Sequence, residues 1–227
     1  MEQCLDFTKD NKEALLELIE WADAHGVGDV VWIEHDSYLE GGYFRGVPRD
    51  IATLENLKEL NLLGCQLTEL PEQIGALSQL EKLYVTDNKL TSIPASIGKL
   101  HNLKELYLPG NSLAQLPKEL FSLHNLEALY LQENQLSALP QEIQSLRKLK
   151  ILELGLNKLE TLPKELGKLQ NLKKLTLWRN KITAFPKELD GLTALEELDF
   201  VYNKVGLTQE NVVWLEKLIN NGCEVDF

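Results

Sequence analysis

Hydrophobic residues recur along this chain with a spacing that changes inside every unit of 23 residues. The stretch LKELYLPGNSLAQLPKELFSL, residues 103–123, shows one unit in full. Leu106 and Leu108 follow a period of two, as in a strand with one buried face, whereas Leu120 and Leu123 follow a helical spacing. Each unit therefore predicts a short strand followed by a tight helical turn.

Two series of residues fix the register of the units. Leucines open them at positions 57, 80, 103, 126, 149, 172 and 195, and prolines stand at positions 48, 71, 94, 117, 140, 163 and 186. Because one unit is too small to bury its own apolar face, copies must stack on one another. We expect repeats over residues 48–205, with parallel strands inside a curved solenoid and each proline at the start of an outer turn, where no backbone donor is needed.

The pattern L-x-x-L-x-L-x-x-N-x-L-x-x-L-P-x-x-L-x-x-L resembles the leucine-rich repeat family, in its 23-residue bacterial and intracellular-signalling variety. The resemblance covers about residues 45–205. It implies an α/β right-handed solenoid, or horseshoe, with a concave parallel β-sheet and convex short helical or 3-10 turns. It also implies a binding role, since the family includes regulators of small GTPases and phosphatases and bacterial effectors that bind host proteins.

A polar residue repeats at the ninth position of the units. Asparagine occupies it six times, at Asn88, Asn111, Asn134, Asn157, Asn180 and Asn203. Ladder hydrogen bonds end where a strand ends, so a buried amide there can satisfy backbone groups of neighbouring turns, and we interpret these residues as a structural ladder. Cys65 holds the same position in the first unit and is expected to be a buried structural thiol.

Residues 1–47 depart from the repeat and are expected to cover the N-terminal end of the stack. Asp10 and Glu13 form a candidate capping box before an amphipathic helix that ends at His25-Gly26. A strand is expected at residues 30–33, followed by a degenerate repeat in which Leu39, Phe44, Val47 and Pro48 hold consensus positions.

Residues 206–227 are expected to cover the C-terminal end. Thr208 is a candidate N-cap for a helix from Gln209 to about Asn220, and Gly222 is a candidate stop. A last strand is expected at residues 225–227. The three regions together predict one structural domain, complete and with no appended catalytic domain.

Charge narrows the classes of partner. The chain has 35 acidic and 23 basic residues, a net charge of −12, and its two ends are the acidic parts while residues 48–205 are nearly neutral. Binding to phosphates needs concentrated lysine and arginine, so the balance disfavours nucleic acid and anionic membranes. We expect a protein or peptide partner and a monomer.

Cysteine spacing and the N-terminal sequence bear on the compartment. Cys4, Cys65 and Cys223 match neither a disulfide framework nor a zinc site, which favours a reducing compartment. The start MEQCLDFTKD has no basic segment followed by an apolar run. We therefore expect a soluble, cytoplasmic protein, while secretion by a signal-free route, as for an effector, stays open.

Counted from the leucine that opens each unit, the third, fifth and seventh residues are expected to face the hollow of the curve, and the eighth lies at the strand exit. The fifth position carries three consecutive tyrosines, Tyr84, Tyr107 and Tyr130, which either bind a partner or stabilise the sheet by stacking. Large or charged residues gather in the last units, and aromatic residues and arginine are enriched at interface hot spots. The candidate partner-binding residues here are Trp178, Tyr202, Arg179, Val201 and Lys174.

Our leading interpretation is a non-enzymatic protein-interaction module that binds through its concave face, with Arg179 and Lys174 selecting an acidic group. A catalytic or metal-dependent role of the N-terminal region is a second reading, with Glu34, His35 and Asp36 as its candidates. His101 and His124, one unit apart, are expected on the outer surface rather than at a metal. Self-association through the hollow or the last strand is a third reading. No cofactor, catalytic residue or metal ligand is expected.

Overall fold

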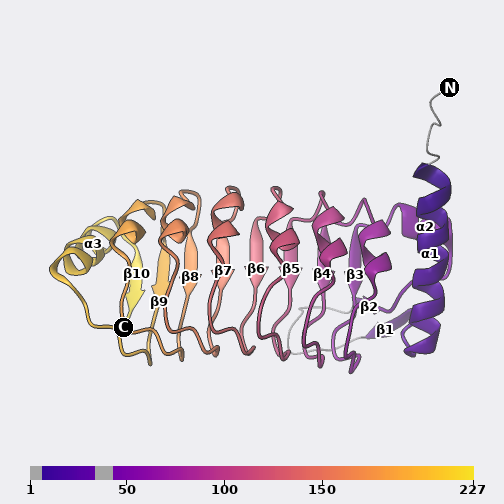
Figure 1. Ribbon diagram of the computed structural model, residues 1–227, viewed down its shortest axis with the longest axis horizontal. Coiled ribbons are helices and arrows are strands. Elements are labelled where there is room, and N and C mark those ends of the chain that lie inside the picture. Colours follow the sequence, from indigo (N-terminus) through magenta and orange to yellow (C-terminus); the bar gives the residue numbers. More distant parts are fainter. Residues whose placement is uncertain (1–6, 34–42) are drawn as a thin grey trace.

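The computed structural model describes residues 7–33 and 43–227, and its strand-and-turn units stand side by side between two helices (Figure 1). The helices are α1 Phe7–Ala24, α2 Ile51–Glu55 and α3 Gln209–Asn220. The strands are β1 Val31–Ile33, β2 Tyr43–Arg45, β3 Glu59–Asn61, β4 Lys82–Tyr84, β5 Glu105–Tyr107, β6 Ala128–Tyr130, β7 Ile151–Glu153, β8 Lys174–Thr176, β9 Glu197–Asp199 and β10 Glu224–Asp226. The 3-10 turns are η1 Glu72–Ala76, η2 Ala95–Lys99, η3 Lys118–Ser122, η4 Gln141–Ser145, η5 Lys164–Lys168 and η6 Lys187–Gly191.

The strands β3 to β10 form one parallel sheet in sequence order, which confirms the predicted solenoid. Neighbouring strands pair in register at a shift of one unit, so Leu83 stands opposite both Leu60 and Leu106. The 3-10 turns lie on the other side of each unit from the strands, and α1 and α3 flank the two ends of the stack (Figure 1). Each row of identical positions therefore runs straight along the solenoid.

Leucine side chains fill the space between the strands and the outer turns. In the unit at residues 103–123, Leu106, Leu108, Leu120 and Leu123 have no exposed surface. Six of the seven prolines in the series, from Pro71 to Pro186, immediately precede a 3-10 turn, as Pro117 does for η3 with a φ of −68°. Pro48 instead comes before helix α2, whose N-cap is Asp50. Burying a leucine contributes about 1.5–3 kcal/mol, and every unit buries several, so stacking stabilises turns too short to persist alone.

The ladder asparagines bridge successive units. Asn134 Oδ1 accepts the Leu113 amide at 3.0 Å, and Nδ2 donates to the Leu108 carbonyl of the preceding unit at 2.9 Å and to the Leu131 carbonyl at 3.2 Å. Cys65, in the same row, is partly buried against the core, and its Sγ donates to the Leu63 carbonyl at 3.6 Å. The thiol is therefore less deeply buried than expected, and it makes no bridge to a neighbouring unit of the kind that the asparagines make.

The residue at the strand exit, in the eighth position, has a left-handed backbone in every unit. The φ values are 65° at Gly64, 54° at Asp87, 65° at Gly110, 55° at Glu133, 54° at Leu156, 51° at Arg179 and 60° at Tyr202. Side chains other than glycine, asparagine and aspartate rarely adopt this region. The register of the stack therefore imposes the conformation at this position, whatever residue occupies it.

The N-terminal region differs from its prediction in two respects. Helix α1 begins at Phe7, so Asp10 lies in its first turn rather than at its cap, where an acid still favours the helix dipole. Strand β2 pairs antiparallel with β1 instead of continuing the repeat, and Phe44 is 64% exposed. A degenerate repeat is therefore wrong at Phe44, although Val47 is buried as expected; the predicted Leu39 lies outside the described residues.

The C-terminal region follows its prediction closely. Thr208 accepts the Asn211 amide, and the Asn211 side chain accepts the Thr208 amide, which completes a capping box at the start of α3. Gly222 takes a φ of 88° just beyond the helix, and β10 then joins the sheet beside β9. Trp214 of α3 packs edge-to-face on Phe185, with the ring centroids 6.1 Å apart, so the helix closes the apolar core at this end.

Candidate functional site

Three tyrosines form a continuous stack across strands β4, β5 and β6. The ring centroids of Tyr84 and Tyr107 lie 4.3 Å apart with an interplanar angle of 15°, and those of Tyr107 and Tyr130 lie 4.3 Å apart at 7°. Tyr84, at one end of the stack, is only 7% exposed. The stack thus presents its ring edges, rather than its ring faces, to the hollow.

The phenol groups of this stack are held in their neutral form. Tyr107 Oη donates to Glu105 Oε2 at 2.6 Å. Burial and this hydrogen bond raise the pKa of Tyr107, and burial likewise raises the pKa of Tyr84 and of Tyr130. The geometry gives the tyrosines a role in holding the sheet together.

Charged residues of the third row are largely paired within the chain. Lys82 lies 3.0 Å from Glu105, and Lys174 lies between two carboxylates, 3.2 Å from Glu153 and 3.1 Å from Glu197. Glu153 also accepts a hydrogen bond from Gln132. The positive charge of Lys174 is therefore already neutralised by ion pairs within the chain, and the sequence alone did not indicate these pairs.

Arg179 stands between two aromatic rings at the strand exit. Its Cζ lies 5.9 Å from the ring centroid of Trp178 and 5.4 Å from that of Tyr202, both within the range of cation–π contacts. Tyr202 is 72% exposed, and Val201 accepts the Arg179 amide at 2.9 Å. The structure thus brings together four of the residues that the sequence singled out.

Trp178 is half-buried, not open to water as its position in the repeat suggests. Its indole fills the space above Gly155, the residue in the same row one unit earlier, where a β-carbon would overlap the ring. The 23-residue spacing of Gly155 and Trp178 in the seventh row was a signal for this contact. Trp178 therefore has a packing role in addition to any role in binding.

Carboxylates gather on the last strands of the hollow. Burial raises the pKa of Asp199, and the negative charges of Asp226 and Glu197 raise it further, while a hydrogen bond from the Val201 amide, at 3.0 Å, opposes the shift. This acidic surface adjoins the aromatic cluster and is part of the site that the sequence analysis did not select.

The remaining candidates for chemistry give no assembled site. Glu34, His35 and Asp36 lie outside the described residues, and His101 and His124 are exposed. Within residues 7–33 and 43–227, no group of three or more histidine, cysteine, aspartate and glutamate side chains is arranged to hold a metal ion. A pocket of about 620 Å³ lies between η6 and α3, lined by both charged and apolar side chains such as Glu188, Lys217 and Val213. None of the described helices is both long and apolar enough to cross a membrane.

Comparison with known sequences places most of the chain in one family. The family model described as a leucine-rich repeat region matches residues 43–129 and 95–221. No curated protein matches the sequence.

Solved structures extend the comparison. A leucine-rich repeat protein of Leptospira interrogans is 31% identical, with a TM-score of 0.52 over 80% of this chain and 57% of that chain. The ectodomain of the Arabidopsis thaliana membrane receptor kinase GASSHO1/SCHENGEN3 was solved in complex with CASPARIAN STRIP INTEGRITY FACTOR 2. It is 31% identical, with a TM-score of 0.64, and the match covers 70% of this chain and 20% of that chain. An internalin of Listeria monocytogenes, 22% identical with a TM-score of 0.56 over 75% and 56%, shares the fold. The chain spans less than two thirds of each of these three structures.

Proposed function

Since this chain belongs to the leucine-rich repeat family, we propose that it is a non-enzymatic module that binds a protein or peptide partner through its concave face. The family fold is a common scaffold for protein–protein interaction, and the plant receptor ectodomain it resembles was solved with a bound factor. The partner of this chain would contact the strand-exit end of the last units, where Arg179 and Tyr202 are exposed and form no ion pair among the described residues.

One observation carries this proposal: Arg179 stacks between Trp178 and Tyr202 on the surface, and no carboxylate among the described residues pairs with it. A guanidinium flanked by rings is already ordered, so less side-chain entropy is lost when a partner binds. Tyr202, at 72% exposure, has the most surface to bury. We assign Tyr202 and Arg179 as anchors and Val201 and the edge of Trp178 as their surroundings.

The other predicted residues take lesser parts in this proposal. Tyr107 and Tyr130, which are partly exposed, offer their ring edges as a second patch, whereas Tyr84 is buried and supports them from within the stack. Lys174 shapes the hollow through its two ion pairs and does not select an acidic group by itself. A cytoplasmic, reducing location belongs to the same proposal, because Cys65 and Cys223 are free thiols.

Affinity capture tests the proposal. We expect the unaltered protein, immobilised, to retain a specific partner from a lysate of its source organism, and a variant with Arg179→Ala and Tyr202→Ala to lose it. Both residues are exposed, so thermal unfolding of this variant should stay close to that of the unaltered protein.

The matched control removes exposed apolar surface elsewhere. Val213→Ala and Ile219→Ala on α3 truncate side chains that are 40% and 50% exposed, and this variant should retain the partner. Retention by the Arg179/Tyr202 variant, at the level of the α3 variant, would contradict the assignment of the site.

A further inference from the structure

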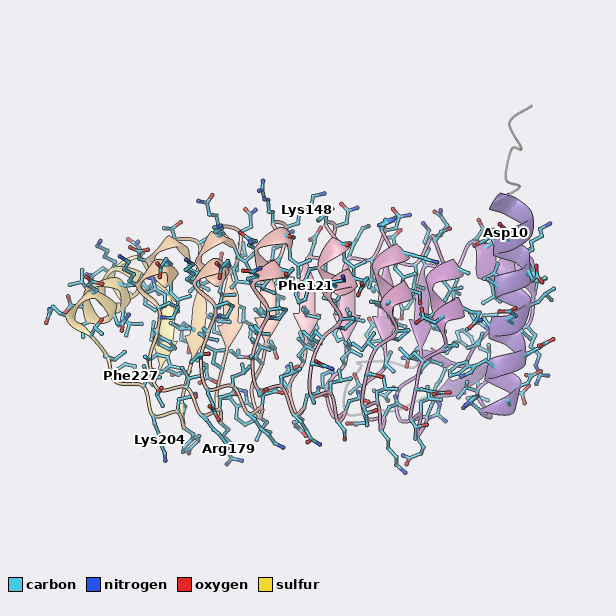
Figure 2. The ribbon with its side chains drawn as sticks, in the orientation of Figure 1. Asp10, Phe121, Lys148, Arg179, Lys204 and Phe227 are labelled. Carbon is cyan, nitrogen blue, oxygen red and sulfur yellow. The ribbon has the colours of Figure 1, made fainter. Side chains whose placement is uncertain are left out.

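A row of cations follows the strand-exit edge of the last three units. Lys158, Lys181 and Lys204 occupy the tenth position of successive units, and Arg179 occupies the eighth position of the middle one. Equivalent positions in neighbouring parallel strands lie about 4.8 Å apart. Figure 2 shows Arg179 and Lys204 extending from the same edge, opposite the edge where Lys148 lies. We call Lys158, Arg179, Lys181 and Lys204 the basic edge.

The basic edge contrasts with the rest of the chain, whose net charge is −12. The loops that form it, residues 156–161, 179–184 and 202–207, contain these four cations and one acid, Glu160. Nearer the N-terminus, the eighth positions carry no cation but Asp87 and Glu133, and the one cation at a tenth position, Lys89, is offset by Asp87 in the same loop. The excess of positive charge is therefore confined to the same units as the aromatic cluster.

Most cations elsewhere on the strand side form ion pairs within the chain. These pairs are Lys104–Glu81 at 2.5 Å, Lys150–Glu127 at 2.6 Å and Lys173–Glu196 at 2.6 Å, together with those of Lys82 and Lys174. Lys89, for which the described residues give no ion pair, has Asp87 two residues before it. Within the described part of the chain, Arg179, Lys181 and Lys204 form no ion pair, and Lys158 donates to Gln135 Oε1 at 3.1 Å. The basic edge thus carries charge that the fold leaves unmatched.

Unpaired lysines on the outer turns do not produce the same effect. Three of these lysines are followed directly by a glutamate, in Lys118-Glu119, Lys164-Glu165 and Lys187-Glu188. The charges of such neighbours largely cancel beyond a Debye length of about 8–10 Å. Lys99 and Lys168 stand singly in η2 and η5 and do not form a row of cations on successive units. A field that extends outward arises at the basic edge and not at the outer turns.

We propose that the basic edge binds an extended acidic segment of the protein partner, a conclusion that rests on the proposed function and specifies its ligand. The two rings beside Arg179 cover the guanidinium, so its N–H groups are available for a two-pronged bond to a carboxylate. The three lysines then accommodate further carboxylates along the segment. The aromatic rings select an apolar or aromatic residue next to the acids.

A protein segment fits this surface better than nucleic acid or a lipid surface. The hollow beside the basic edge carries Glu197, Asp199 and Asp226, which repel any broad array of negative charge. An extended chain is narrow enough to follow the edge without crossing the hollow. The charge pattern therefore matches a short acidic peptide and opposes a duplex.

Fluorescence anisotropy tests this inference with a labelled peptide of alternating glutamate and serine, about ten residues long, which would span about 33 Å when extended. We expect binding that weakens as salt is added. Replacing Lys158, Lys181 and Lys204 together by glutamate should weaken it at least about tenfold. Arg179→Lys, which keeps the charge but removes the planar fork, should weaken it about threefold.

The control variant carries Lys118→Glu, Lys164→Glu and Lys187→Glu on the outer turns, which gives the same change in net charge. Its affinity for the peptide should change by less than about twofold, since these positions face away from the edge. Equal weakening by both triple variants, no binding of the peptide, or tighter binding of a DNA duplex or of phosphatidylserine vesicles would overturn the inference. So would a molecular mass that rises with concentration and is abolished by the edge variant, because a second copy would then be the occupant.

The outcome is separable from that of the proposed function. If the captured partner depends on Arg179 and Tyr202 but its binding is indifferent to charge reversal at the three lysines, the interaction module stands and the acidic ligand is rejected. If no partner is captured through Arg179 and Tyr202, the proposed function fails whatever the peptide does.

Discussion

The indole of Trp178 lies directly over Gly155, the residue 23 positions earlier in the same row of the sheet. Glycine at that point leaves room that no other residue would leave, and the tryptophan occupies it. The largest side chain of the concave face is therefore positioned by the smallest one.

Gly155→Ala tests this packing. The added methyl group would overlap Nε1 and Cε2 of the indole, and a rigid ring cannot yield as a flexible chain can, so Trp178 must leave its site. We expect the free energy of unfolding, measured with urea, to fall by about 1–3 kcal/mol, with a change in tryptophan fluorescence. Gly206→Ala is the control, because the nearest atom to its β-carbon, outside the adjacent residues, would be 3.7 Å away; an equal loss there would argue against the contact.

Asn134→Ala should remove a bridge between units. Without the amide, the buried Leu113 N–H loses its acceptor, and the Leu108 carbonyl keeps only the hydrogen bond from Asn111 Nδ2. We expect a loss of about 3 kcal/mol in the free energy of unfolding, measured by chemical denaturation. Asn171→Ala, which removes one exposed bond to the Arg147 carbonyl at 2.8 Å, should cost less than about 1 kcal/mol. Similar losses at both sites would show that the buried ladder asparagine contributes no more to stability than an exposed asparagine does.

Variants of Tyr107 separate the stacking role of the tyrosines from a binding role. Tyr107→Phe keeps both ring contacts and loses the hydrogen bond to Glu105, so it should cost about 1 kcal/mol of unfolding free energy. Tyr107→Ala opens the stack and should cost about 2–4 kcal/mol. Thermal and urea unfolding measure both. A phenylalanine variant that is stable but no longer retains the partner would assign the hydroxyl to binding instead.

Asp199→Asn should change how stability depends on pH. Because burial and nearby acids raise the pKa of Asp199, the folded chain keeps this proton to a higher pH than the unfolded chain does. The free energy of unfolding therefore falls as pH rises from the ordinary aspartate pKa through the folded value, and ionised Asp199 opposes folding at neutral pH. The asparagine retains an acceptor for the Val201 amide, at 3.0 Å in the unaltered chain.

Urea unfolding at a series of pH values checks the pH dependence. The asparagine variant should be the more stable protein at neutral pH, and the difference should vanish below the ordinary aspartate pKa. Asp190→Asn, on the exposed outer turn η6, makes the same change of charge and serves as the control. A lower stability of the Asp199 variant at neutral pH would contradict the expected sign.

Sequence reasoning identified the core and the asparagine ladder of the repeat. The 23-residue period assigns Leu106 to the core and Asn134 to the strand end, because each unit must stack in register to bury its leucines. It also brings Trp178, Arg179 and Tyr202 together, since residues in neighbouring rows and adjacent units must be neighbours. The repeat fails at Phe44, where the antiparallel pairing of β1 and β2 replaces it.

Side-chain pairing within the hollow lay beyond sequence reasoning. Lys174 appeared free to bind an acid, but whether it contacts Glu153, Glu197 or solvent depends on rotamers and not on register. The same holds for the half-burial of Trp178, although the glycine in its row was visible in the sequence. The register of the repeat identifies which residues are neighbours. The burial and ion pairing of a side chain depend in addition on the sizes and rotamers of those neighbours.

At the strand exit, the left-handed backbone conformation does not depend on which side chain occupies the position. Leu156, Arg179 and Tyr202 differ in size and charge, yet their φ values lie between 51° and 60°. Exchange of a side chain in this row thus needs no rebuilding of the main chain. Substitutions in this row can therefore change the ligand specificity of the surface one residue at a time, while the backbone of the solenoid stays the same.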